Sequence, residues 1–130
     1  MRDLASNVSV EPSIAPAVQS ATIVGETIDL LGSESAAFVF ATGAIVGAGV
    51  FVPSIEESDT GNESPDDFDP VAAADIIGEV PDQLEASSVL KLGYTGNKRY
   101  IRAKLTKSSG TSIAAGAVVV MGNLHVKPAV

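Results

Sequence analysis

Carboxylate side chains are crowded into residues 56–70, EESDTGNESPDDFDP, which hold seven of the 16 acidic residues of the chain. Several carboxylates on one loop are the ligands that calcium prefers. The spacing differs from that of an EF-hand loop, whose ligands alternate around a central glycine. Charge runs of this kind more often keep a loop hydrated. We therefore expect an acidic loop in solvent, with no metal ion and no other cofactor.

Side chains able to act as catalysts are few. The chain has no cysteine and one histidine, His125. No thiolate is available as a nucleophile, and one histidine cannot build the usual zinc site without cysteines. The nucleophile elbow, the phosphate-binding loop and the dinucleotide fingerprint are missing from the sequence. A Ser-His-Asp triad depends on spatial proximity and stays open, but we expect His125 to lie in an exposed tail and the protein not to be an enzyme.

Positive charge is confined to the C-terminal part of the chain. Residues 1–90 hold all the acidic residues and a single base, Arg2, whereas residues 91–130 hold seven bases and no acid. Opposite potentials on separate surfaces steer partners or copies together. Alternatively, the acidic and basic segments are neighbours within one fold, where surface charge pairs contribute little. The net charge of −8 argues against a nucleic-acid partner.

Most of the bases are positioned by residues 89–106, which the pattern predicts to form a β-hairpin. Two apolar and aromatic runs flank TGNK at residues 95–98, where Gly and Asn tolerate the positive φ of a tight turn. In the second run Ile101, Ala103 and Leu105 alternate with polar or basic residues, which predicts a strand buried on one face. We predict that the exposed basic face binds a partner through Lys98, Arg99, Arg102 and Lys104.

The N-terminal residues 1–17 are predicted to form an extended arm outside the β domain, which would cover residues 18–130. Pro12 and Pro16 favour extended backbone, and no helical or strand period is sustained. A frayed terminus is the alternative. Apolar side chains gain nothing from exposure on a free tail, so we expect a neighbouring subunit to be clasped by Leu4, Val8, Val10 and Ile14.

The composition predicts an all-β domain with many turns, because Gly, Val, Ala, Ser and Thr are plentiful while aromatic residues make up 5% of the chain. Strands are expected over residues 18–24, 27–31 and 113–121, and a helical turn or a strand over residues 71–77. The uncharged residues 35–55 could span a bilayer by length. Acidic flanks, several glycines and an alternating pattern around residues 42–43 favour two buried strands instead. We expect no membrane contact and no signal peptide.

Several segments resemble small structural proteins of tailed bacteriophages. The resemblance covers about residues 18–124 and is most specific in GYTGNKRYIR at residues 93–102. The other segments are VQSAT at 18–22, IDL at 28–30, SA at 35–36, EESD at 56–59, ADIIG at 74–78 and AVVVMGN at 117–123.

This resemblance implies a jelly-roll-like antiparallel β-sandwich that is a virion component. The most plausible role it implies is that of a capsid cement or decoration protein, made in the host bacterial cytoplasm and bound at the capsid surface. The implied partners are the major capsid protein and further copies of the chain, as a dimer or trimer. Two alternatives remain open at this point: another head–tail or tail component, and a glycan-binding β-sandwich module.

Overall fold

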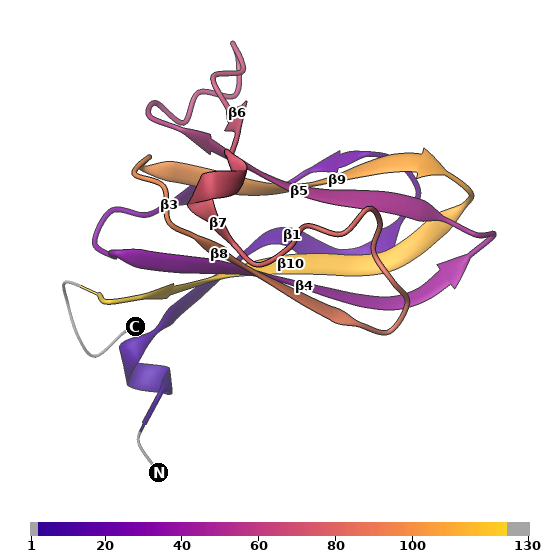
Figure 1. The fold of residues 1–130 in the computed structure, drawn as a ribbon, viewed down its shortest axis with the longest axis horizontal. Coiled ribbons are helices and arrows are strands. Elements are labelled where there is room, and N and C mark those ends of the chain that lie inside the picture. The colour runs from indigo at the N-terminus through magenta and orange to yellow at the C-terminus, as the bar shows by residue number, and fades with distance from the viewer. Residues whose placement is uncertain (1–2, 125–130) are drawn as a thin grey trace.

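Two antiparallel β-sheets packed face to face form residues 3–124, the part of the chain that the computed structural model describes (Figure 1). Sheet A has the strand order β1-β10-β4-β8-β7, and sheet B has the order β2-β9-β5-β6, with β3 also pairing with β9. The elements in chain order are η1 (Ala5–Asn7), β1 (Ser9–Gln19), β2 (Ile23–Val24), β3 (Ile28–Asp29), β4 (Ser35–Val46), β5 (Val50–Ser58), β6 (Asp69–Pro70), η2 (Ala73–Asp75), β7 (Ile76–Ile77), β8 (Val89–Tyr94), β9 (Tyr100–Ser109) and β10 (Ser112–Gly122).

The strand pairing is nested. Strand β1 pairs with β10, β2 and β3 pair with β9, β4 pairs with β8, and β5 pairs with β6. Such a pattern arises when one long antiparallel ribbon wraps around itself, so that successive strands fall alternately in two sheets, which is the topology of a jelly roll. The expected all-β, jelly-roll-like sandwich is therefore confirmed.

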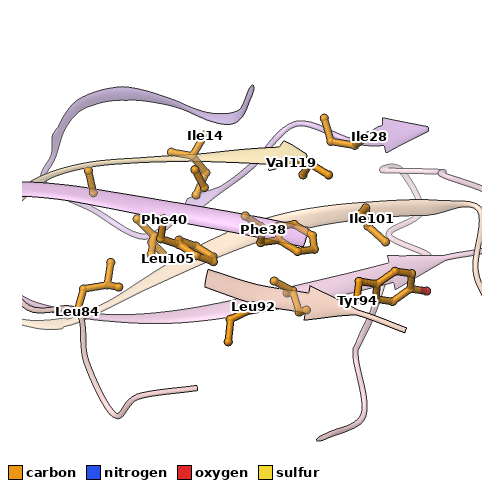
Figure 2. Packing of buried hydrophobic residues seen from close by; sticks show 14 of the residues in the cluster. Ile14, Ile28, Phe38, Phe40, Leu84, Leu92, Tyr94, Ile101, Leu105 and Val119 are labelled. Carbon is orange, nitrogen blue, oxygen red and sulfur yellow. The ribbon is translucent and has the colours of Figure 1, made fainter. Parts of the chain in front are cut away.

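The core lies between the sheets and takes side chains from both. Figure 2 shows Phe38 and Phe40 from β4 facing Ile101 and Leu105 from β9, and all four side chains are 0% exposed. The rings of Phe38 and Phe40 lie 6.4 Å apart between centroids. Ala103 is also fully buried. The prediction that Ile101, Ala103 and Leu105 form the buried face of one strand is therefore correct. Alternation with period two thus identified the inward face of β9.

The predicted hairpin over residues 89–106 is wrong. Strand β8 belongs to sheet A and β9 to sheet B, so residues 95–99 carry the chain from one sheet to the other. Gly96 does not adopt positive φ; it lies against the Tyr94 ring, where an added Cβ would be 2.6 Å from Cζ. The backbone N–H of Lys98 donates to the Tyr94 hydroxyl over 3.1 Å. The segment is therefore a crossing between sheets anchored on Tyr94.

The predicted separation of an arm at residues 1–17 also differs from the structure. Residues 9–17 are part of β1 and pair with β10, so the expected boundary falls inside a strand. Ile14 is 1% exposed and belongs to the core of its own chain. The prolines fit because β1 is an edge strand with register shifts after Pro12 and after Ile14, the positions where a sheet tolerates a missing N–H.

The uncharged residues 35–55 form β4 and the first part of β5, as two strands rather than a helix. The turn between them lies at residues 47–49, later than the break expected at residues 42–43. Gly47 and Ala48 have positive φ values of 62° and 55° there. Within residues 3–124, no helix is long and apolar enough to cross a bilayer.

Candidate interaction surface

The outer face of sheet B carries a buried ion cluster built on Arg102. Arg102 on β9 is directly opposite Glu56 on β5 in the strand register. The loop between β5 and β6 then folds back over this pair and brings Asp66 and Phe68 onto it. We call Arg102, Glu56, Asp66 and Phe68 the Arg102 cluster.

The polar contacts in the Arg102 cluster are all within hydrogen-bond distance. The Arg102 Nε donates to Glu56 Oε1 over 2.8 Å, and one terminal nitrogen donates to both Asp66 oxygens over 3.1 Å. The guanidinium carbon lies 4.0 Å from the centroid of the Phe68 ring, a cation–π geometry. The Arg102 side chain is 5% exposed and that of Glu56 is 11% exposed. The pKa of Asp66 is lowered, chiefly by the backbone N–H of Phe68 and then by Arg102.

The expectation that Arg102 projects into solvent is therefore wrong. The alternating pattern placed it correctly on the face opposite Ile101, but the acidic loop covers that part of the face. A buried arginine with paired carboxylates stabilises one arrangement of loop and sheet, because removing one partner leaves an uncompensated charge. The acidic loop and the basic strand are thus partners within one chain at this point.

Lys98 and Arg99 stay at the surface, and each is paired with an acid of the same chain. Lys98 Nζ lies 2.8 Å from Asp59 Oδ2, and Arg99 binds both oxygens of Asp29 over 2.9 and 2.8 Å. The hydrogen bond from Arg99 lowers the pKa of Asp29, and Asp59 raises the pKa of Lys98. All four side chains are 37% to 68% exposed, so solvent screening leaves each pair with only a small contribution to stability.

Tyr94 links the sheet crossing to sheet B. Its hydroxyl donates to Glu57 Oε1 over 2.8 Å and accepts from the Lys98 N–H. The residue is 6% exposed. Burial, and then the Glu57 carboxylate, raise the pKa of the Tyr94 phenol, so the residue stays a neutral donor. Together, the hydrogen bonds from Tyr94 to Glu57 and from the Lys98 N–H to Tyr94 fix residues 95–99 relative to β5.

Lys104 is the predicted partner-binding base that is left without an ion pair among the described residues. It lies on β9 and is half-buried on the outer face of sheet B, opposite Ser54. Arg102 and Lys104 thus lie on β9 and Lys98 and Arg99 directly before it, and three of the four bases are neutralised within the chain. Their binding of an external partner stays a prediction.

The four predicted apolar contacts of the N-terminal segment do not form one surface. Ile14 is in the core, while Leu4 is 69% exposed in the residues before η1 and Val10 is 54% exposed on β1. Val8 is half-buried. Ile14 therefore cannot reach a neighbouring subunit, which leaves Leu4, Val8 and Val10 for that predicted role.

The feature that sequence reasoning missed is the outer face of sheet A. Apart from Lys91 on β8, its side chains are apolar or small on β1, β10, β4 and β8, in contrast to the charged outer face of sheet B. A shallow open groove of about 410 Å³ runs over it between Pro16, Val39 and Ala114. The signal was present, because residues 35–46 and 112–122 lack charge at both odd and even positions. Such a pattern is also typical of strands that are buried on both faces, so it does not by itself predict an exposed apolar face.

A second groove of about 510 Å³ lies between residues 30–36 and residues 94–99. It is open to solvent, and its basic side chains, Lys98 and Arg99, are already paired with acids. Residues 3–124 contain no group of three or more Asp, Glu or His side chains arranged to hold a metal ion. His125 lies outside the described residues.

A comparison with protein-family models and a comparison with curated proteins gave no match to this chain. Among solved structures, the chain is similar to a chain in the structure of infectious bursal disease virus, Gx strain. The sequences are 16% identical, and the TM-score is 0.48. The match covers 88% of this chain and 32% of that chain, so the present chain spans about a third of the length of the viral one.

Proposed function

We propose that the protein is a structural component of a tailed-phage virion, and specifically a capsid cement protein that binds the assembled shell of the major capsid protein. The supporting observation concerns residues 93–102, which carry the most specific resemblance to phage structural proteins. In the structure these residues make the Tyr94 anchor, both surface ion pairs and the Arg102 cluster. Because the Tyr94 anchor and the Arg102 cluster hold this segment and the acidic loop in place, a likeness in this segment supports a shared architecture.

The mechanism would be stabilisation by mass action. A protein that binds the assembled shell, and not its dissociated subunits, raises the stability of the shell by about 2.7 kcal/mol when its free concentration is 100 times its Kd. Unpaired Lys104 favours an acidic patch on the shell. The ion pairs of Lys98 and Arg99 are exposed. Each base can therefore leave its carboxylate within the chain and bind a carboxylate of the partner at little cost in free energy.

The glycan-binding alternative has less support. Sugar recognition of this kind uses an exposed aromatic face, whereas Tyr94 and Phe68 are almost fully buried and Phe38, Phe40 and Phe51 completely so. The remaining aromatic residue, Tyr100, is half-buried, with the Arg99 guanidinium 5.0 Å from its ring centroid.

The proposal is tested by mixing the protein with empty shells of the major capsid protein of the same virus. We expect the protein to sediment with the shells and to raise the temperature at which they disrupt, with binding that weakens as salt increases. Lys104→Glu should weaken binding, whereas the matched change Lys91→Glu, on the opposite sheet, should leave it unchanged. Absence of binding to such shells would refute the cement role, and equal effects of the two variants would refute the sheet B contact surface.

A further inference from the structure

The two outer faces of the sandwich differ in chemistry. The outer face of sheet B holds the Arg102 cluster, Lys104 and the surface ion pairs. On sheet A, the side chains that alternate with the buried core residues are almost all uncharged and apolar, and several are strongly exposed, among them Val18 at 69% and Val89 at 71%. An apolar face of this extent needs a partner more than scattered exposed residues do.

The strand register arranges the outer residues of sheet A in rows across its strands. Lys91 is the single charged residue in these rows, which we call the sheet A face. One row is Val10, Val120, Ala37, Gly93 and Ile77; the next is Pro12, Val118, Val39 and Lys91; the third is Gly116, Ala41 and Val89; the fourth is Val18 and Ala114.

We propose that the sheet A face binds the same face of a second copy of this chain and forms a two-fold dimer. The distribution of charge favours contact through the sheet A face over contact through other surfaces. The chain has a net charge of −8, so two copies repel each other through most contact geometries. The sheet A face carries none of the acids, and contact through it brings no carboxylates of the two copies together. Stacking it on the outer face of sheet B would instead remove water from Lys104 without supplying a partner charge.

The size of the face is sufficient for a stable dimer. Strands β1, β10, β4 and β8 have 11, 11, 12 and 6 residues, and at about 3.3 Å along each strand and about 4.8 Å between strands they cover about 630 Å². A standard protein interface buries about 800 Å² on each partner. The estimate is close to a tenth of the accessible surface of the described chain, 7331 Å², which matches the fraction of surface that small proteins bury in such interfaces.

The shape of the face also fits a copy of itself. Small side chains at Ala114, Gly116 and Ala41 leave the shallow groove of about 410 Å³, and the exposed Val18 stands at its border. A two-fold contact places the same residues on both sides, so a projecting side chain of one copy can enter the groove of the other. Lys91 lies on β8, beyond the residues that pair with β7, so its ammonium group can reach solvent at the rim.

This inference does not depend on the virion role, because it concerns the isolated protein. Sedimentation equilibrium of the wild type should give the mass of a dimer. Val118→Asp, in the middle of the face, should raise the Kd of the dimer by about 100-fold or more, since it would bury an unpaired carboxylate. Val24→Asp is the matched control, because Val24 is 47% exposed on the outer face of sheet B, and it should remain a dimer.

A wild type that is monomeric at a concentration of several hundred micromolar, or that forms a trimer, would overturn the proposal. So would a Val118→Asp protein that folds and keeps the wild-type mass. Val39→Cys provides a second measurement that does not rely on a charged variant, because the chain has no cysteine of its own. Its rate of maleimide labelling should fall as protein concentration rises, whereas that of Thr106→Cys, exposed on sheet B, should stay constant. Equal behaviour of the two cysteines would contradict the interface.

Discussion

Replacement of Arg102 by methionine tests whether the Arg102 cluster holds the acidic loop on sheet B. Arg102→Met keeps much of the side-chain volume over Phe68 and removes the guanidinium. Glu56, whose side chain is 11% exposed, then loses its cation. Removing one member of a buried ion pair typically costs about 3–5 kcal/mol. Asp66 adds little to this cost, because its side chain is 58% exposed and stays hydrated.

The free energy of unfolding of Arg102→Met should therefore fall by about 3–5 kcal/mol in urea denaturation. At about 4 °C for each kcal/mol in a chain of this size, the Tm should fall by about 12–20 °C. Lys98→Met is the control: Lys98 belongs to an exposed pair, so this variant should leave the free energy of unfolding almost unchanged.

The double variant Arg102→Met, Glu56→Leu separates the cost of an orphaned carboxylate from the cost of lost packing. It should recover most of the lost stability, because apolar replacements of a buried ion pair are often neutral or stabilising. A single variant that loses less than about 1 kcal/mol would show that Glu56 remains solvated and that the burial argument is wrong.

Three further predictions concern pH, packing and the N-terminal strand. Arg99 lowers the pKa of Asp29 below 3.8, so this pair stabilises the fold above that pH and the contribution is lost as the pH falls through the lowered value; the acid dependence of the urea midpoint should be shallower in Asp29→Asn. Gly96→Ala places a Cβ against the Tyr94 ring and should lower the free energy of unfolding by about 1–3 kcal/mol, whereas an unchanged Tm would show that the crossing adapts. Deletion of residues 1–16 should abolish the cooperative melting transition seen by circular dichroism, because it removes most of β1, whereas deletion of only the first seven residues should shift the Tm by a few degrees at most.

The strands themselves could be predicted from the sequence where local alternation reports burial. Ile101 and Leu105 on β9, and the apolar run of β10, were placed correctly on that basis. The partners of each strand could not be predicted in the same way. A glycine and an asparagine at residues 96–97 suggest a hairpin, but the crossing between sheets is set by Tyr94 and Glu57, which are 37 residues apart.

At the candidate site, too, the direction of a side chain could be predicted from the sequence, whereas its contacts could not. The sequence placed Arg102 on the outward side of its strand, which is correct as a direction. Its burial depends on Asp66 and Phe68, which reach it only because the loop after β5 folds back. No local pattern contains that information. Charge segregation along the chain had two explanations, and the ion pairs of Lys98, Arg99 and Arg102 show that neighbouring segments of one fold account for much of it.

The nested pairing of the strands also sets the order in which the protein can fold. Ser9 at the start of β1 is paired with Met121 near the end of β10, so sheet A is completed only when almost the whole described chain is available. During synthesis on a ribosome, β1 and β4 must therefore wait without the strand that lies between them. Pairings of such long sequence separation slow folding to the range of milliseconds to seconds. The uncharged strand β4 is the segment that a chaperone would bind during this interval.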